Sequence, residues 1–519
     1  MKTEEISQKK VRHFVDKIKT LDELEEIVRQ QKTEGQKVVL CHGVFDLLHP
    51  GHIHHFQAAR KNGDCLIVSI TKDEYVGKGP GRPVFNERLR AETIAALECV
   101  DFAVINQWPT AIETIRKLKP NVYVKGSDYA NPEEDITGNI RLEEKAVREV
   151  GGQLVFTDEI SFSSSNVINN FLDVFPEETQ SFLQSFRSRY TADGVINKIN
   201  ELGKLKLLVI GDAIIDEYHY CQAMGKSPKE TIVATRYVNE ESFAGGVLAC
   251  ANHVAAFCDR VDLITCLGSQ NSREDFIRKH LKPNIRPTFF YRDDASTVIK
   301  RRFVEPTFLS KMFQICFLND TNLPLEIDRQ LQDYLTKVLP DYDAVLVADY
   351  GHGLISPETI SILESKAKFL AVNTQTNSAN LGFNLITKYR KADYICIDEP
   401  EIRLALHNRT GQLEKLILRI HKLLRAETVN ITRGHLGSLT YSANESFLST
   451  PVFSNEIVDR VGAGDAFFAI SSPCASARFP IDLIGFIGNM AGELAVKIVC
   501  NRSFIEPVPL FRFIKTVFK

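Results

Sequence analysis

The sequence predicts an α/β protein with two domains in series, each built around a mainly parallel sheet. Short apolar runs alternate with helix-forming stretches in both halves of the chain, which is typical of a doubly wound sheet. A polar stretch rich in Glu, Gln, Ser and Arg interrupts this alternation at residues 176–203. A new apolar run at 205–210 then ends in Gly211-Asp212, which predicts the first strand of a second sheet.

The composition narrows the function classes. With 519 residues, 44% of them hydrophobic and 25% charged, the chain resembles an ordinary globular protein rather than a disordered one. A net charge of −3 gives no basic field for nucleic acid or an anionic membrane. No uncharged apolar run reaches the ~18 residues of a membrane helix, and no signal peptide is visible. Eleven scattered cysteines without a Cys-x-x-Cys pair indicate free thiols. We expect a cytoplasmic protein without nucleic-acid or membrane partners.

The first domain is expected at 31–175, after a helical extension at 1–30. In this extension Leu21, Leu24, Ile27 and Val28 form one apolar stripe on a helix. The expected strands of the domain are 38–41, 65–70, 102–105 and 122–124, and its helices begin at Pro50 and span 86–98 and 109–118.

The second domain is expected at 204–519, after a helical linker at 176–203. Besides the opening strand, its expected strands are 261–264, 344–348, 369–372, 394–397 and 428–431. No short-period repeat connects the two halves, so the domains are expected to be unrelated.

A histidine cluster follows the first expected strand. Five of the 13 histidines lie within 14 residues: His42, His49, His52, His54 and His55. One interpretation is a metal site, which needs converging ligands of suitable type. Another is phosphate chemistry, because Pro50 suits the first position of a helix and places His49 and His52 at its N-terminus, where anions are favoured. A third is that these are incidental surface histidines.

Residues 43–52 favour the phosphate interpretation. They resemble the signature G-x-F-D-x-x-H-x-G-H of the cytidylyltransferase-like nucleotidyltransferase superfamily, with every signature position present. The resemblance covers about 20–172 and implies a Rossmann-like nucleotidyltransferase domain. It also implies that His49 and His52 stabilise the α-phosphate in the transition state, with Gly43, Phe45 and Asp46 in the nucleotide site.

Further positions match this family downstream. Lys78 and Arg82 lie in a glycine-rich basic loop that could neutralise the leaving pyrophosphate. Arg90 aligns with a family arginine, although a plain surface role is also open. Lys125 and Asp128 match a K-G-x-D-Y strand end. Three hydroxyls match a helix start that either caps the helix or binds phosphate, namely Ser163, Ser164 and Ser165.

The base and the acceptor stay open. The most similar subgroup is the sugar-1-phosphate, or heptose-1-phosphate, adenylyltransferases. This subgroup favours ATP as the nucleotide. CTP stays open, because glycerol-3-phosphate and ethanolamine-phosphate cytidylyltransferases share the signature.

A glycine-rich acidic turn dominates the second half. Residues 459–468 read D-R-V-G-A-G-D-A-F-F, which predicts a helix N-terminus with open amides for a phosphoryl group. Asp465 is placed to take the proton of an attacking hydroxyl. The pattern D-x-x-G-A-G-D resembles the signature of ribokinase-type (PfkB) carbohydrate kinases. This resemblance implies a ribokinase-like α/β domain over about 204–510, with Gly462, Ala463 and Gly464 as the anion hole.

Other family elements follow in order. Thr432, Gly434 and Gly437 match a T-x-G-x-x-G that lines the ATP site. The expected sugar-binding set combines acids, a di-glycine and two basic residues that could hold a substrate phosphate: Asp212, Asp216, Gly245, Gly246, Lys300 and Arg302. For these residues, turn aspartates, a structural glycine turn and plain surface charge remain alternatives.

The second half departs from the family at three places. The N-x-x-E that organises Mg²⁺ through water appears as Asp398 and Glu401, and Asp is also a hard oxygen ligand. The asparagine after the di-glycine is absent, where the chain has Ala249-Cys250. The usual V-D-P after the central strand is replaced at 372–374. These changes surround the expected sugar and Mg²⁺ regions.

The combined expectation is a bifunctional enzyme of nucleotide-activated sugar synthesis that uses ATP, or CTP, and Mg²⁺. It would transfer a nucleotidyl group to a sugar 1-phosphate and phosphorylate a sugar or sugar phosphate of heptose type. The chain resembles the heptose-7-phosphate kinase/heptose-1-phosphate adenylyltransferase family with its two modules in the opposite order. We expect a homodimer. The alternative is a cytidylyltransferase for a polyol or other sugar phosphate, fused to a diverged, regulatory kinase-like domain.

Overall fold

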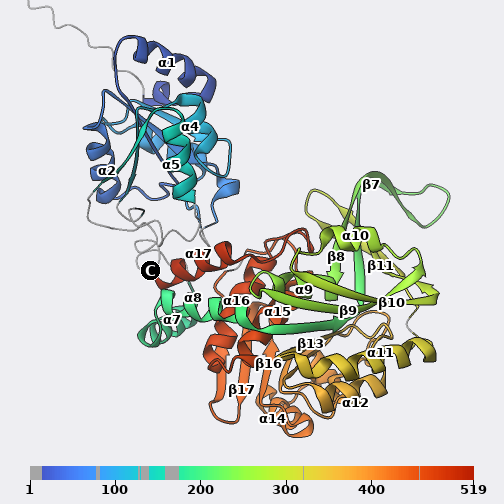
Figure 1. Ribbon diagram of the computed structural model, residues 1–519. Helices are drawn as coiled ribbons and strands as arrows, with labels where there is room; N and C mark the ends of the chain where they lie inside the picture. Colours follow the sequence, from blue (N-terminus) through green and yellow to red (C-terminus); the bar gives the residue numbers. More distant parts are fainter. Residues whose placement is uncertain are drawn as a thin grey trace, which may run out of the picture. The chain divides into compact units, whose positions relative to one another are not determined.

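The chain divides into two compact units, each described here by itself. The computed structural model describes residues 14–77, 82–126, 129, 139–157, 175–319, 321–454 and 456–519 (Figure 1). Unit 1 comprises 1–176 with 511–519, and unit 2 comprises 177–510.

Unit 1 contains a five-stranded parallel sheet in the order β3-β2-β1-β4-β5. Its strands are β1 (Val38–Gly43), β2 (Cys65–Thr71), β3 (Phe102–Asn106), β4 (Val122–Gly126) and β5 (Gln153–Thr157). The strand order reverses between β1 and β4. In open α/β sheets a crevice for ligands forms at the carboxyl ends of the strands at such a point.

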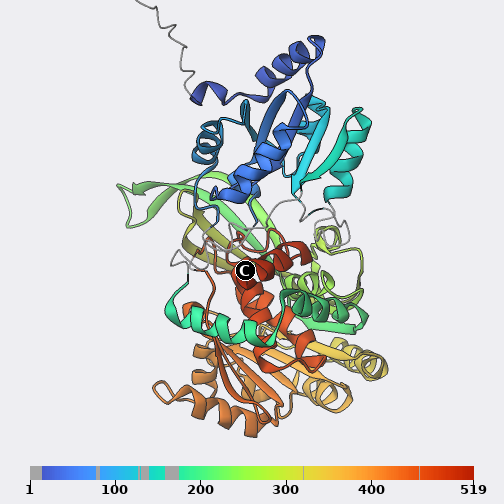
Figure 2. The ribbon, with the colours of Figure 1, turned by 90° about the vertical axis from the view of Figure 1, so that its left-hand side faces the viewer.

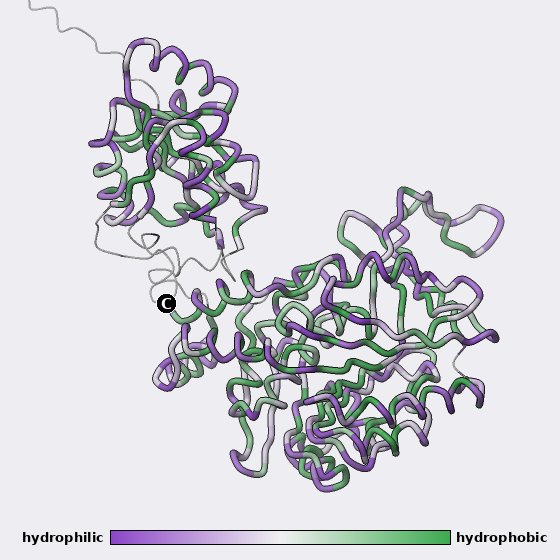
Figure 3. The backbone as a smooth tube through the Cα atoms, in the orientation of Figure 1, coloured by the Kyte–Doolittle hydropathy of each residue, from purple (hydrophilic) through white to green (hydrophobic). Residues whose placement is uncertain are grey.

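Helices cover both faces of this sheet because alternate strand residues point to opposite sides. Val39 and Cys41 pack with α2 (Pro50–Arg60) and α3 (Glu87–Ala95). Val38 and Leu40 pack toward three other helices: α1 (Leu21–Thr33), α4 (Ile112–Leu118) and α5 (Asn139–Glu149). In Figure 3 the apolar colour follows the strands inside this unit.

The apolar stripe expected near the N-terminus lies on α1. Thr20 and Glu23 form a capping box that fixes the start of this helix. Leu24 and Val28 are buried in the core of unit 1, so α1 is one of the layers of the domain.

Unit 2 is built on a nine-stranded sheet in the order β10-β9-β6-β13-β14-β15-β16-β17-β18. The strands are parallel from β10 to β16, and β17 and β18 are antiparallel. Their bounds are β6 (Lys206–Gly211), β9 (Arg260–Gln270), β10 (Ile285–Ser296), β13 (Ala344–Asp349), β14 (Leu370–Thr374), β15 (Tyr394–Asp398), β16 (Thr428–Thr432), β17 (Ser438–Ser442) and β18 (Ser446–Thr450).

Helices also cover both faces of the large sheet (Figure 2). One face packs against α11 (Leu325–Val338), α12 (Pro357–Lys366), α13 (Glu399–Ala405) and α14 (Leu413–Leu424). Tyr394, from the opposite face, hydrogen-bonds Ser471 of α15 (Ala463–Ser476) at 2.8 Å. The neighbours of α15 are α9 (Val247–Ala255) and α16 (Ile481–Ala495).

A separate four-stranded sheet in unit 2 was not expected from the sequence. Its order is β12-β11-β7-β8, and its strands are β7 (Ala213–Lys226), β8 (Val233–Gly246), β11 (Val298–Glu305) and β12 (Ser310–Phe317). Large apolar side chains are exposed on it, including Met224, Val233 and Phe313. Cys316 on β12 is the exposed cysteine among the eleven.

The stretch 176–203, expected as a helical linker, contains α7 (Glu177–Arg189) and α8 (Ala192–Glu201) within unit 2. Phe186 stacks on Phe486 of α16 with ring centroids 4.3 Å apart, and Tyr190 donates to Asp482 at 3.0 Å. Two further helices are α10 (Glu274–His280) and α17 (Pro507–Phe518). No helix in the described ranges is both long and apolar enough to cross a membrane.

Candidate functional site

The first candidate site begins where β1 ends. Phe45 adopts a left-handed backbone with φ 48° and packs its ring over Gly43, where a Cβ would lie 2.9 Å from that ring. The chain then enters α2, with His49 as the N-cap residue and Pro50 as its first residue. The signature residues therefore place His49 at a helix N-terminus beside the carboxyl end of β1.

His49 and His52 form a stacked pair at this helix start. Their ring centroids are 3.9 Å apart, and Phe45 meets His52 edge-on at 5.5 Å. No described residue forms a hydrogen bond with either ring nitrogen of His49. Burial lowers the pKa of His49, so its imidazole is neutral at neutral pH and keeps one N–H donor.

The other histidines of the cluster have different surroundings. His42 contacts the hydroxyls of Ser69 and Thr71 at 3.1 and 3.3 Å, and burial lowers its pKa to about 4. His55 contacts the Thr157 hydroxyl at 2.8 Å, and burial lowers its pKa to about 4 as well. Within the described ranges no three metal-binding side chains converge.

Asp46 fixes the chain that follows the basic loop. Its carboxylate accepts hydrogen bonds from the backbone N–H groups of Val84 at 2.8 Å and Phe85 at 3.1 Å. Arg82 is buried nearby, where desolvation lowers its pKa and Asp46 partly opposes that effect. Lys78, the other expected cation of this loop, lies outside the described residues.

Arg90 connects several loops from a fully buried position. Its guanidinium donates to the carbonyls of Phe85, Val44 and Thr71 and pairs with Asp73. The sequence predicts that Arg90 contacts the nucleotide, but in the structure its hydrogen-bond donors are engaged with protein groups. In this arrangement Arg90 supports the loops that surround His49.

Lys125 lies at the carboxyl end of β4, the strand next to β1. Its ammonium pairs with Glu143 at 3.1 Å, and the Tyr123 hydroxyl donates to the same carboxylate oxygen at 3.0 Å. Burial lowers the pKa of Lys125, but Glu143 outweighs this and the net pKa is raised, so the cation persists. Asp128, Ser163, Ser164 and Ser165 lie outside the described residues.

The second candidate site begins at the N-terminus of α15. Gly462 is the N-cap with φ 87°, and a Cβ there would lie 2.4 Å from Oδ1 of Asn501. Ala463 is the first helical residue. A Cβ at Gly464 would meet no atom within 4 Å, so open space faces this turn. The three residues expected as an anion hole thus surround an accessible helix N-terminus.

Asp465 follows in the first turn of α15 and is buried. Its Oδ1 accepts hydrogen bonds from the Tyr350 hydroxyl at 2.8 Å and from Nε2 of Gln375 at 2.5 Å. Burial raises the pKa of Asp465 to about 6, although both hydrogen bonds lower it. A carboxylate with this pKa is ionised at neutral pH and can still accept a proton.

The two expected sugar-binding acids have different partners. Asp212 accepts backbone hydrogen bonds from Tyr350 at 3.1 Å and His352 at 3.2 Å, so it fixes the turn after β13. Burial and nearby Asp349 raise the pKa of Asp212 to about 6. Asp216 lies on β7 of the four-stranded sheet and forms an ion pair with Arg302 of β11.

Lys300 is the register partner of Asp216 on β11 and is buried. No described residue reaches its ammonium with a hydrogen bond or salt bridge. Burial lowers the pKa of Lys300, and Asp216 opposes that effect. Gly245 and Gly246 pair with β7 alongside, where a Cβ on Gly245 would lie 2.0 Å from Oδ2 of Asp216. Because glycine has no Cβ, Gly245 leaves room for the Asp216 carboxylate.

The T-x-G-x-x-G stretch forms a tight turn after β16. Thr432 ends that strand, and Gly434 and Gly437 have φ of 57° and 79°. A Cβ on Gly437 would lie 2.0 Å from the Thr450 carbonyl, whereas a Cβ on Gly434 would meet nothing within 4 Å. Gly437 thus serves packing, and Gly434 faces open space.

Asp398 and Glu401 form a reciprocal cap on α13. Asp398 accepts from the Glu401 N–H at 2.7 Å, and Glu401 accepts from the N–H groups of Asp398 at 2.8 Å and Thr376 at 2.9 Å. Burial and Asp398 raise the pKa of Glu401 to about 8. Each carboxylate oxygen keeps a second lone pair, so the pair fits contact with the water shell of Mg²⁺ better than direct coordination.

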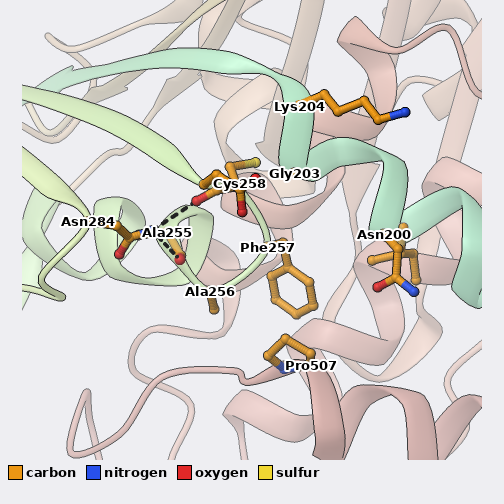
Figure 4. A pocket seen from close by; sticks show the side chains of 11 residues that line it. Asn200, Gly203, Lys204, Ala255, Ala256, Phe257, Cys258, Asn284 and Pro507 are labelled. Atoms are coloured by element: carbon orange, nitrogen blue, oxygen red, sulfur yellow. Dashed lines mark hydrogen bonds between the residues drawn. The ribbon is translucent and has the colours of Figure 1, made fainter. Parts of the chain in front are cut away.

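A hollow of about 360 Å³ lies away from both sets of residues (Figure 4). Gly203, Asp259 and Asn284 line it. Asp259 and Asn284 directly precede β9 and β10, and Gly203 lies three residues before β6. It therefore lies at the amino ends of these strands, whereas Asp212 follows the carboxyl end of β6. Asn284 bridges the Ala255 and Cys258 carbonyls at 2.9 Å. No expected site residue lines this hollow.

The sequence analysis assigned no functional role to Tyr350, Gln375 or Glu143. A signal for the first two was present, since Tyr350 follows β13 and Gln375 follows β14, which are neighbouring parallel strands. Carboxyl ends of neighbouring parallel strands meet at one edge of a sheet. Glu143 carries no comparable signal, because it lies in the middle of α5.

Comparisons with known proteins match a different family model to each half of the chain. Residues 40–170 match the family model described as cytidylyltransferase-like, and residues 204–497 match that of the pfkB family carbohydrate kinases. The bifunctional protein HldE of Geobacter metallireducens is 38% identical over 165 residues, which are 31% of this chain and 32% of that protein. HldE of Geotalea uraniireducens is 48% identical over 115 residues, 22% of this chain and 24% of that protein.

Each of these matches spans about a third or less of the curated relative. Among solved structures, the ribokinases of Thermotoga maritima and Arabidopsis thaliana have TM-scores of 0.48 and 0.46 at 19% and 16% identity. Both comparisons cover 60% of this chain and 99% of the other. The pfkB model covers more than half of the present sequence, and this chain belongs to the pfkB family of carbohydrate kinases.

Proposed function

We propose that this chain is a bifunctional cytoplasmic enzyme of nucleotide-activated sugar synthesis. Unit 1 transfers a nucleotidyl group, preferably from ATP, to a sugar 1-phosphate and releases pyrophosphate. Unit 2 uses ATP to phosphorylate a sugar or sugar phosphate of heptose type. One observation carries the proposal: in each unit an accessible helix N-terminus lies at the carboxyl end of the sheet beside a proton-carrying side chain, His49 or Asp465.

In unit 1 a phosphate oxygen of the acceptor attacks the α-phosphorus, and the bond to the bridging oxygen of pyrophosphate breaks. The N–H of His49 donates to the α-phosphate as its charge grows, and His52 orients the His49 ring by stacking and adds a second donor. Arg82 and Lys78 neutralise the leaving pyrophosphate. Lys125 at the end of β4, kept cationic by Glu143, binds the nucleotide phosphates.

The remaining unit 1 residues complete the nucleotide site in this proposal. Gly43 and Phe45 shape the turn under the nucleotide, and Asp46 and Arg90 fix the neighbouring loops. Asp128 and the hydroxyls of Ser163, Ser164 and Ser165 bind the ribose and phosphates, as the family resemblance implies.

In unit 2 Asp465 takes the proton of the attacking sugar hydroxyl, whose oxygen bonds to the γ-phosphorus while the bond to ADP breaks. The amides around Gly464 receive the transferring phosphoryl group. Thr432 and Gly434 line the ATP site, with Gly437 shaping the turn. Asp216 binds sugar hydroxyls.

Lys300 and Arg302 hold a phosphate that the substrate already carries. The buried ammonium of Lys300 supports this assignment, because it has no anionic hydrogen-bond partner among the described residues. Magnesium would accompany the ATP phosphates and supply charge neutralisation there. Asp398 and Glu401 would contact its water shell.

A homodimer is part of the proposal. The four-stranded sheet carries exposed large apolar side chains on several of its strands, namely Met224, Val233, Tyr237, Phe313 and Phe317. Such a face is costly to leave in water, and pairing with a second copy would cover it.

A second candidate is a cytidylyltransferase fused to a regulatory kinase-like domain. It is favoured by one observation: Ala249 and Cys250 occupy the buried stretch after the di-glycine, where the family has an asparagine. A thiol cannot replace the amide of asparagine as a two-way hydrogen-bonding group.

One experiment separates the two candidates. The full chain is incubated with ATP or CTP, pyrophosphatase and a panel of sugar and polyol phosphates, and phosphate release is measured. ADP formation is followed in parallel with each sugar and sugar phosphate. Turnover with ATP and sugar-dependent ADP formation support the first candidate. Turnover with CTP alone and no ADP formation would establish the second.

A further inference from the structure

Two side chains from neighbouring strand ends converge on one oxygen of Asp465. Both the Tyr350 hydroxyl and the Gln375 amide donate to Oδ1, and within the described ranges no hydrogen bond reaches Oδ2. Burial and the nearby Asp465 carboxylate keep the pKa of Tyr350 well above its usual value, so the phenol stays a donor. The carboxylate is thus held asymmetrically.

Both donors are anchored through their own backbone. The N–H of Tyr350 donates to Oδ2 of Asp212 at 3.1 Å. The N–H of Gln375 donates to the Asp349 carbonyl at 2.9 Å, and the Gln375 carbonyl accepts from Asn384 at 3.1 Å. Groups fixed in this way can position a carboxylate without reorganising when the substrate arrives.

Gln375 comes from a place where the chain departs from its family. Residues 372–374 replace the usual V-D-P after the central strand, and Gln375 follows directly. The departure therefore does not leave the region without function. It supplies an uncharged donor at the edge of the sheet, within reach of the first turn of α15.

We infer that Tyr350 and Gln375 are positioning residues for phosphoryl transfer, which fix Oδ1 of Asp465 and leave Oδ2 as the proton acceptor. The inference rests on the proposed kinase function. Both hydrogen bonds favour the ionised carboxylate, so they also keep the base competent at lower pH. Neither residue contacts the substrate hydroxyl itself.

Other charged groups also act on Asp465 and stay constant in the test. Asp216 raises the pKa of Asp465, and Lys300 lowers it. The Cys250 thiol lies 3.7 Å from the Tyr350 hydroxyl and 4.0 Å from the backbone carbonyl of Asp465. Burial keeps the pKa of this thiol well above its usual value, so it remains neutral.

The test compares pH profiles of kcat/KM for ADP formation by the full chain, with the sugar substrate found in the panel experiment. The variants are Tyr350→Phe, Gln375→Met and Gln375→Glu. The control is Tyr394→Phe, which removes another buried tyrosine hydroxyl that bonds to α15 through Ser471 rather than Asp465. Circular dichroism and the nucleotidyl-transfer rate of each variant monitor folding.

We expect the acid limb to move to higher pH by roughly one unit for Tyr350→Phe and for Gln375→Met, because each loses one hydrogen bond to the ionised carboxylate. Gln375→Glu should move it further, since two carboxyls then share a proton. Tyr394→Phe should leave the limb in place. KM for ATP should stay within about twofold in all variants, because none of the substitutions removes a contact that binds ATP in the ground state.

The outcomes distinguish the inference from the function on which it rests. If the wild-type chain forms no ADP with any sugar or sugar phosphate, the proposed kinase function fails and the inference fails with it. If the wild type is active and the variant limbs superimpose on it, the positioning role alone is wrong. Equal shifts in Tyr394→Phe would also overturn it, because the effect would then be general loosening of α15.

Discussion

His49 and His52 stack face to face at the start of α2, with ring centroids 3.9 Å apart and an interplanar angle of 26°. The spacing of three residues gives this contact, because positions i and i+3 lie on the same side of a helix. The stack orients the His49 ring, whose nitrogens have no hydrogen-bond partner among the described residues. The pair is therefore organised before any ligand arrives.

Replacing His49 should remove nucleotidyl transfer and spare the kinase. We expect His49→Ala to lower kcat for pyrophosphate release by about 10²- to 10³-fold, the usual loss for one transition-state donor. His54→Ala is the matched control, because His54 lies exposed on the same helix. ADP formation by unit 2 should be unchanged in both. A His49→Ala enzyme as active as the control would show that this imidazole is not part of the site.

Two glycines of the α15 turn should respond differently to alanine. Gly464→Ala adds a methyl group where no atom lies within 4 Å, so folding should be unaffected while the methyl occupies the space for the phosphoryl group. We expect kcat for ADP formation to fall at least about tenfold. Gly462→Ala strains a backbone at φ 87° and clashes with Asn501, so it should lower the thermal midpoint as well.

These two variants are compared by calorimetry and by steady-state kinetics. Equal activity of Gly464→Ala and wild type contradicts the assignment of this turn as the anion hole.

The kinase rate should depend on the protonation of Asp465. A protonated carboxyl cannot take the hydroxyl proton, and burial raises the pKa of Asp465 to about 6. The rate of ADP formation should therefore be constant above pH 7 and fall tenfold per unit below about pH 6. Asp465→Asn should lose about 10²- to 10⁴-fold at pH 7.5 while nucleotidyl transfer persists. A profile that is flat down to pH 5 would mean that another group is the base.

Arg90 should contribute stability to unit 1. Arg90→Ala leaves three carbonyls and one carboxylate without their donor, which we expect to cost about 3 kcal/mol. Arg88→Ala, on the same helix, removes only a solvent-exposed pair with Glu92 and should cost a few tenths of a kcal/mol. Urea unfolding followed by fluorescence reports on unit 1 alone, because the one tryptophan of the chain is Trp108.

The parallel strands could be predicted because they are buried on both faces. The run at 65–70 expected from apolar residues is β2, whose residues are all buried, and 394–397 lies within β15. Strand β8 could not be predicted in this way. Most of its first nine residues are exposed and several are charged, so no apolar run marks this strand. Its extended structure depends on hydrogen bonding to β7, which no local signal in the sequence indicates.

The site residues that could be predicted are likewise those whose environment is set by the local chain. Residues of short motifs, such as His49 and Gly462, could be predicted because the local chain builds their geometry. Arg90 lies within the resemblance, yet its burial and its carbonyl partners depend on loops distant in sequence. Tyr350 and Gln375 meet Asp465 only after the strands are ordered in the sheet, so no local pattern contains that contact.

The exposed thiol of Cys316 on β12 is a site for attaching a fluorescent dye to unit 2. Of the other ten cysteines, eight are buried, and two, Cys99 and Cys266, are partly accessible. Cys316 pairs across strands with Lys300, so the two side chains share one face of the four-stranded sheet. A maleimide dye at Cys316 would sit beside the buried ammonium, and its emission would report occupancy by an anionic ligand without any turnover.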